Sequence, residues 1–90
     1  MIFNTKYIYK SLNGHIIVPI ARQITYYICK VYYTTEDKIF DQGLYGYDLY
    51  GKCLEDKGNR NANVRIYLKY LPKNLQKMIK SDKKKGKNYV

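Results

Sequence analysis

Four lysines near the C-terminus are spaced so that an α-helix would bring them onto one side. Lys73, Lys77, Lys80 and Lys84 follow one another at intervals of four, three and four residues. Residues three and four apart are neighbours on a helix surface. Lysine ammonium groups bind phosphates as point charges, which gives affinity for a nucleic-acid backbone with little sequence preference. These four residues, called the lysine stripe below, therefore predict electrostatic contact with a polyanion.

A second basic group precedes the stripe. Arg65, Tyr67 and Lys69 alternate with apolar residues between positions 64 and 70, so a β-strand would place all three on its solvent face. Tyrosine and arginine side chains stack on unpaired bases. We expect this strand and the stripe to form one continuous basic surface. Besides Lys84, further lysines would extend it at the C-terminal end, namely Lys83, Lys85 and Lys87.

The placement of the charged residues is stronger evidence for this binding surface than the net charge is. The chain has 17 Lys+Arg against 7 Asp+Glu, a formal net charge of +10, but abundant Lys with little Ala is also typical of AT-rich genomes. Residues 57–90 hold eleven basic residues and one acid, whereas residues 36–56 hold six acids and two lysines. Such segregation of charge indicates a positively charged surface that binds a polyanion. The alternative is a solvated helix face with a solubilising tail.

The residue types of enzyme chemistry form no recognisable set. A Cys–His nucleophile would need His15 with Cys29 or Cys53, but His15 lies beside a predicted tight turn. The six acids of residues 36–56 lack the spacing of metal ligands, and a single histidine excludes zinc sites that need two. We therefore expect no enzyme, no metal and no cofactor. The remaining catalytic candidate is a metal-free ribonuclease that uses Arg65, Tyr67 and Lys69.

Tyrosines also stand among glycines in the middle of the chain. Leu44-Tyr45-Gly46 is echoed five residues later by Leu49-Tyr50-Gly51, with Tyr47 between them. A mobile aromatic loop of this kind would stack on bases or enter a protein groove. A bent strand whose tyrosines cover the core is the interpretation that we favour. If the loop binds protein, Tyr45, Tyr47 and Tyr50 would be the contact residues of a small phage- or mobile-element-encoded inhibitor of a host or defence enzyme.

A hairpin is the clearest local element. Asn13-Gly14 suits a two-residue type I′ turn between the apolar stretches 7–12 and 15–20. That turn would pair Tyr9 with Val18 and would place both, with Ile16 and Ile20, on one buried face. Proline cannot donate a ladder hydrogen bond, so Pro19 should lie at a sheet edge or near the end of its strand.

Two further strands and a helix follow. Ile24 to Thr34 is rich in β-branched and aromatic residues on both alternating faces, which favours a strand inside a sheet. The acidic stretch after Glu36 should be mostly irregular. Val64 to Tyr70 alternates as a half-buried strand, and Pro72 suits the first turn of a helix. That helix would bury Leu71, Leu75, Met78 and Ile79 and fray between Lys83 and Gly86.

Together these features predict an α+β fold. We expect a small antiparallel β-sheet or partly closed β-barrel of four to six short strands, with one amphipathic C-terminal helix. Residues 1–82 would form a single domain, and residues 83–90 a basic, flexible tail. No run approaches the roughly 18 apolar residues of a membrane span, and the N-terminus lacks the order of a signal peptide. We therefore expect a cytoplasmic protein, in the host cytoplasm if it is viral.

The predicted function is that of a small basic, non-enzymatic protein that binds the phosphate backbone of DNA or RNA. Its binding surface would be the lysine-rich strand and helix of the C-terminal third. The alternatives are the inhibitor described above, whose partner would be a host protein that itself binds nucleic acid, and a structural component of a ribonucleoprotein. The sequence leaves the choice between DNA and RNA and the oligomeric state open.

Overall fold

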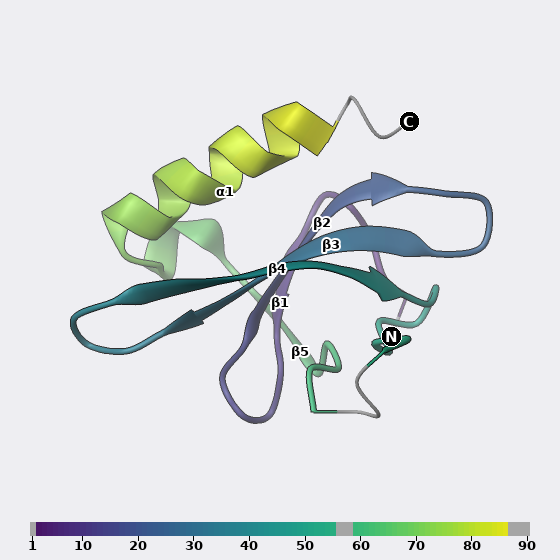
Figure 1. Ribbon diagram of the computed structural model, residues 1–90, viewed down its shortest axis with the longest axis horizontal. Coiled ribbons are helices and arrows are strands. Elements are labelled where there is room, and N and C mark those ends of the chain that lie inside the picture. Colours follow the sequence, from purple (N-terminus) through teal and green to yellow (C-terminus); the bar gives the residue numbers. More distant parts are fainter. Residues whose placement is uncertain (1, 56–58, 87–90) are drawn as a thin grey trace.

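The computed structural model describes residues 2–55 and 59–86 and shows an antiparallel sheet with one helix lying across it (Figure 1). The strand order is β4-β3-β2-β1-β5, so β4 and β5 are the two edges and the sheet is not closed. The elements are β1 (Ile8–Lys10), β2 (Ile16–Arg22), β3 (Tyr27–Thr34), β4 (Ile39–Tyr47), β5 (Val64–Ile66), a short 3-10 helix η1 (Leu68–Tyr70) and α1 (Lys73–Lys85). The predicted α+β class with one C-terminal helix is confirmed.

The helix covers one face of the sheet. Leu75 and Ile79 of α1 are fully buried, and they pack with Ile16, Val18 and Tyr32 of β2 and β3. The helical spacing of apolar residues in the sequence is thus the pattern that docks α1 on the sheet. This packing fixes which side of the helix remains for solvent.

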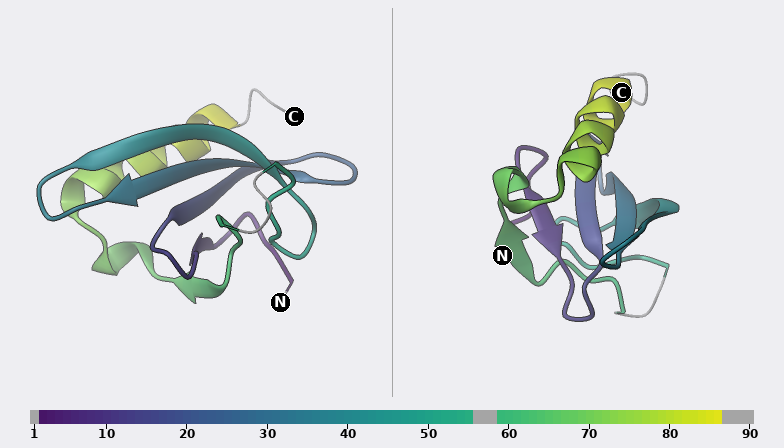
Figure 2. Two further views of the ribbon diagram at one scale, coloured as in Figure 1. Left: turned by 60° about the horizontal axis from the view of Figure 1, so that its bottom comes forward. Right: turned by 90° about the vertical axis from the view of Figure 1, so that its left-hand side faces the viewer.

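The opposite face is also buried, although no helix covers it. Residues 2–7 and the described parts of the irregular segment between β4 and β5, residues 48–55 and 59–63, lie on that side (Figures 1 and 2). Phe3 is the centre of an aromatic cluster there, with ring centroids 4.6 Å from Tyr9, 5.0 Å from Tyr27 and 5.7 Å from Tyr47. Tyrosine side chains, together with Phe3, therefore build a second core on this face of the sheet.

The hydroxyl groups of these tyrosines are satisfied by backbone. Tyr9 Oη accepts the N–H of Asn4 at 3.0 Å, Tyr27 Oη donates to the carbonyl oxygen of Phe3 at 3.0 Å, and Tyr47 Oη donates to that of Arg60. Burying a polar group is tolerable when it is hydrogen-bonded. The same bonds tie the N-terminal segment and the 48–63 segment to the sheet.

The β1–β2 hairpin differs from the prediction by one residue in its register. The loop has three residues, 12–14, and the N–H of Gly14 donates to the carbonyl oxygen of Ser11 at 3.2 Å. Gly14 has φ 90°, so it occupies the left-handed position of a three-residue hairpin loop, which glycine accepts without strain. Tyr9 consequently pairs with Ile17.

This shift separates residues that were expected to share a face. Tyr9 and Ile17 lie in the aromatic core, whereas Ile16, Val18 and Ile20 lie beneath α1. The prediction was wrong because it took Asn13-Gly14 as a two-residue turn, whereas the loop has three residues and shifts the register by one. Since both faces are covered, hydrophobic alternation carries no information on the register.

Strand β2 runs through Pro19 to Arg22 in the middle of the sheet. The prediction of an edge near Pro19 holds locally, because β1 pairs only with Ile16 and Ile17 and leaves the rest of β2 with one neighbour, β3. The C-terminal end of α1 packs against this part of β2, at Ile20. A Cβ atom built on Gly86 would overlap the carbonyl oxygen of Ile20, so only glycine allows this approach.

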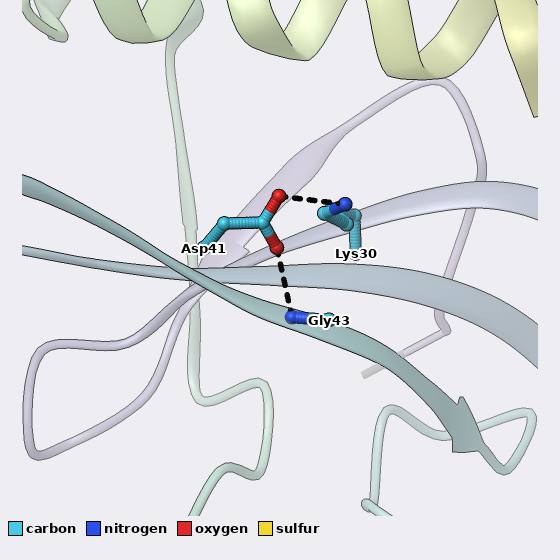
Figure 3. A network of polar contacts seen from close by, with 3 residues as sticks. All are labelled: Lys30, Asp41 and Gly43. Atoms are coloured by element: carbon cyan, nitrogen blue, oxygen red, sulfur yellow. Dashed lines mark hydrogen bonds and ion pairs between the residues drawn. The ribbon is translucent and has the colours of Figure 1, made fainter.

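The acidic region is more regular than expected. β4 pairs with β3 along most of its nine residues, with a bulge and Gly43 at φ 92°. The carboxylate of Asp41 accepts the N–H of Gly43 at 2.9 Å and pairs with Lys30 Nζ at 2.8 Å on the side that faces α1 (Figure 3). Burial alone would raise the pKa of Asp41, but the hydrogen bonds from Lys30 and Gly43 and the charge of Lys30 outweigh it, so the pKa is lowered.

Three predicted ends of strands and helices also differ from the observed ones. β3 is an interior strand as predicted, but it begins at Tyr27, and Ile24 is 93% exposed. The strand expected over residues 64–70 stops at Ile66, since residues 68–70 turn as η1. α1 does not fray at Lys83, because it continues to Lys85 and ends at Gly86. Lys83, Lys84 and Lys85 are therefore helical, and residues 87–90 of the predicted tail lie outside the described residues.

Candidate nucleic-acid interface

The lysine stripe lies on the solvent side of α1. All four stripe residues are exposed, whereas Leu75 and Ile79 on the same helix are fully buried. At about 100° per residue, the stripe falls opposite the Leu75–Ile79 side. The spacing between the first and last of these lysines corresponds to about 16 Å along the helix axis. The ammonium groups of the four stripe lysines therefore lie in a row along α1, which is itself packed on the sheet.

Lys83 differs from the other lysines of the helix. Its Nζ donates to the carbonyl oxygen of Thr5 at 2.7 Å. Burial lowers the pKa of Lys83, while the nearby thiol of Cys29 acts in the opposite direction. Lys83 thus joins the end of α1 to the N-terminal segment and is not presented to solvent as the stripe is. Lys84 and Lys85 are exposed, and Lys87 lies outside the described residues.

The second predicted group forms a cluster of cations and rings at the β5 edge. The Arg65 guanidinium lies 3.4 Å from the ring centroid of Tyr7 and 5.1 Å from that of Tyr67. Lys69 Nζ lies 5.1 Å from the ring centroid of Tyr70, and the Tyr67 and Tyr70 rings meet edge to face at 6.2 Å. These five residues are called the arginine–tyrosine cluster below. The structure thus brings Arg65, Tyr67 and Lys69 together as expected, although Lys69 arrives there through η1.

A groove of about 450 Å³ adjoins the cluster. Tyr33 from β3 and Tyr67 and Tyr70 from the β5–η1 corner line it, and Lys10 of β1 contributes a cation. The rest of the lining is Gly14, Ile16, Thr34, Arg65, Ile66 and Leu71, so no acidic residue is among the described lining residues. An anionic ligand would meet positive charge and aromatic rings in this groove.

Sequence reasoning missed several residues of this groove. Tyr70 was expected on the core side of a strand but is 75% exposed, because η1 turns it outward. Tyr33 lay within a run that is apolar or aromatic on both faces, and Lys10 lay in a hairpin. Neither had a local signal, because strand pairing, which sets β1 beside β5 and β2 between β1 and β3, is what brings these residues to one groove.

A second hollow of about 340 Å³ lies between the arginine–tyrosine cluster and the C-terminal half of α1. Its lining includes Lys6, Tyr7, Arg65 and Lys83. The stripe points away from the sheet, so these cations, and not the stripe itself, border the cluster. The basic surface, which was expected to be continuous, is therefore two separate groups, and Lys6 and Lys83 line the hollow between them.

The three tyrosines proposed for protein contact do not form a surface. Tyr47 has no exposed area and belongs to the aromatic core. Tyr45 packs against that core, and Arg60 Cζ lies 5.1 Å from its ring centroid. Only Tyr50 is largely exposed, at 71%. Tyr47 is thus excluded as a contact residue, and the favoured interpretation of tyrosines on a bent strand applies to Tyr45 and Tyr47.

The groups considered for catalysis are not assembled. The ring of His15 lies beside Tyr33 at the hairpin end of the sheet, with centroids 5.2 Å apart. Cys29 pairs with Pro19, four residues further along the chain than His15, and faces the aromatic core. Both Cys29 and Cys53 are buried free thiols, and burial raises the pKa of Cys29 well above its usual value.

Neither a metal-binding cluster nor a membrane-spanning helix occurs among the described residues. Within residues 2–55 and 59–86, no three His, Cys, Asp or Glu side chains gather in a way that could hold a metal ion. No helix in the same part of the chain has the length and apolar character needed to cross a membrane.

Comparison with known proteins gives no relative on which a function could rest. No family model matches the chain, and no significant match occurs among curated proteins or solved structures.

Proposed function

We propose that this protein is a non-enzymatic nucleic-acid-associated protein that contacts the phosphate backbone through the lysine stripe. The observation that carries the proposal is the row of four exposed lysines on α1, opposite the docked side of the helix. Phosphates along one strand of B-DNA recur every 3.4 Å of helix axis, so about 16 Å of stripe faces several of them. Arg65, Tyr67 and Lys69 extend the surface at the β5 edge.

The placement of the acids supports a binding face over a solubilising one. Of the seven acids, only Asp82 falls in α1, and it is half-buried, outside the stripe. Lysines three and four residues apart on a helix repel one another. A surface needed for solubility alone would carry positively and negatively charged side chains interspersed with one another. A bound polyanion would offset this repulsion by attracting each lysine.

Titration of labelled oligonucleotides tests the proposal. Fluorescence anisotropy would be recorded with single-stranded DNA, duplex DNA and RNA between 50 and 200 mM salt. Contact with four or five phosphates predicts a slope of about −4 in log K against log salt. Absence of binding at the lowest salt would reject the proposal.

A second candidate is an inhibitor that docks on a host or defence enzyme, and the edge of β4 over residues 39–44 favours it; further along, Gly46 and Tyr47 already pair with residues 53 and 54. β4 is an edge strand, and Phe40 and Leu44 on it are 43% and 42% exposed. An exposed apolar edge is a template for pairing with another chain. Recovery of one stoichiometric protein after nuclease treatment would favour this candidate. A structural role in a ribonucleoprotein would use the same lysines as the first proposal, but within an ordered assembly.

A cytoplasmic location, in the host if the source is a virus, is part of the proposal. It is supported by the two cysteines, which are both free thiols. Reducing compartments keep cysteines in this form.

A further inference from the structure

We propose that the groove beside the arginine–tyrosine cluster binds an unstacked base of a single-stranded nucleic acid together with its phosphate. This inference rests on the function proposed above. It adds a feature of the ligand, an unstacked base, that the lysine stripe alone could not recognise. The groove lies where strands β3, β2, β1 and β5 succeed one another across the sheet, and Figure 2 shows β5 beside β1 at that edge.

The first observation is the exposure of the aromatic rings. Tyr67 is 52% exposed and Tyr70 is 75% exposed, although both are large aromatic side chains. The two rings meet edge to face, at an interplanar angle of 88°, so their contact does not cover both ring faces. Tyr33 lines the same groove and is 36% exposed. Aromatic faces left open in this way are the platforms on which proteins stack bases.

The second observation is the position of the cations. Arg65 is held against the Tyr7 ring at 3.4 Å, and among the described residues no carboxylate forms an ion pair with it. Stacking on a ring fixes a guanidinium while leaving its N–H groups directed outward. Lys10 lines the groove and Lys69 lies beside Tyr70. Two cations therefore line the groove and a third lies beside one of its rings, and no acidic residue is in the described lining.

The size of the groove defines the ligand. About 450 Å³ is within the range of small-molecule sites, roughly 300–1,000 Å³. It suits one base with its sugar and phosphate, and not a duplex. Bases inside a duplex are stacked on each other and offer no free face, whereas a single strand presents its bases directly. The groove therefore predicts a preference for single strands, while the lysine stripe contacts phosphates in either form.

Substitution of both exposed tyrosines separates these two contributions. Tyr67→Leu with Tyr70→Leu removes the rings but keeps apolar side chains, and exposure of both positions favours retention of the fold, which circular dichroism and thermal melting would verify. Tyr50→Leu is the matched control, because Tyr50 is 71% exposed and lies outside the groove. Dissociation constants would be measured for oligothymidine, oligouridine and a DNA hairpin at one salt concentration.

We expect the double variant to bind single strands at least about tenfold more weakly, with less than a twofold change for the hairpin and for the control. Equal losses on single strands and hairpin, or no loss, would overturn the groove proposal and leave the stripe proposal intact. Failure of the unsubstituted protein to bind any oligonucleotide would reject both.

Photo-crosslinking gives a readout that does not depend on affinity. Oligouridine with a single 5-iodouracil would be irradiated with the unsubstituted protein, and the linked peptide would be identified by mass spectrometry. We expect crosslinks at Tyr67, Tyr70 or Tyr33. Crosslinks confined to residues outside the groove, such as Tyr50, would overturn the proposal.

Discussion

Neutralising part of the lysine stripe should change the salt dependence of nucleic-acid binding by a calculable amount. Each phosphate neutralised on duplex DNA contributes about −0.9 to the slope of log K against log salt. If all four stripe lysines contact phosphates, the slope is about −3.6, and raising salt from 50 to 200 mM weakens binding by about 150-fold. Lys77→Gln with Lys80→Gln leaves two contacts, so the same change in salt should weaken binding by only about 12-fold.

The structure supplies a control with the same change in net charge. Lys38 and Lys52 are exposed, lie in or beside the acidic segment and do not belong to the stripe, although Lys38 borders the start of α1 at Pro72 and Asn74. Lys38→Gln with Lys52→Gln also removes two positive charges. If binding depends only on net charge, the two double variants will give the same slope. If the stripe makes the contacts, only the Lys77–Lys80 pair will flatten it.

Loss of folding would not explain a difference between these variants. Lys77 and Lys80 are exposed, and glutamine has nearly the same helix propensity as lysine. Substitutions at such surface positions usually change stability by less than about 0.5 kcal/mol. Anisotropy titrations at four salt concentrations, with a thermal melt of each protein, would decide. Indistinguishable slopes for the two double variants would refute the assignment of phosphate contacts to the stripe.

Four further predictions concern stability and reactivity. Gly86→Ala should lower the free energy of unfolding by about 1–3 kcal/mol, since an added Cβ meets the β2 backbone; an unchanged urea midpoint would contradict this packing. Tyr32→Phe should be neutral or stabilising by up to about 1 kcal/mol, because this buried hydroxyl has no hydrogen-bond partner among the described residues; a clear loss in the same titration would argue against it. Asp41→Asn should cost about 0.5 kcal/mol at neutral pH, as the carboxylate is 46% exposed. Its lowered pKa means that this contribution is present above about pH 4 and disappears as pH falls further, so thermal melts of the two proteins should converge in acid. Cys29 and Cys53, both buried, should react with Ellman's reagent only after denaturation; rapid reaction of the native protein would refute their burial.

The elements that could be predicted are those whose signals are local. The helical spacing of Leu75 and Ile79 identified the docked side of α1, and with it the exposed stripe. The β-branched and aromatic content of residues 27–34 correctly indicated an interior strand. In both cases the residues that determine the element lie within a few positions of one another, so neighbouring side chains suffice to predict it.

Errors arose where distant segments decide the outcome. The hairpin register depended on Gly14 and on the burial of both faces, and that burial comes from α1 on one side and Phe3 on the other. Local charge suggested a mostly irregular region after Glu36, but residues 39–47 form one strand because they pair with β3 and Asp41 contacts Lys30. Tertiary contacts overrode the local preference in each case.

By itself, the sequence determined the class of fold, the amphipathic helix and the stripe of lysines on it, because charge and hydrophobic spacing are properties of contiguous residues. Only the tertiary structure decided that Lys83 is turned inward, that Tyr47 is a core residue, and that Tyr33 and Lys10 share a groove with Tyr67 and Tyr70. The strand order places β3, β1 and β5 within one stretch of sheet, although their residues are far apart in the chain. A groove of this kind is a consequence of pairing between distant strands, and no local pattern encodes it.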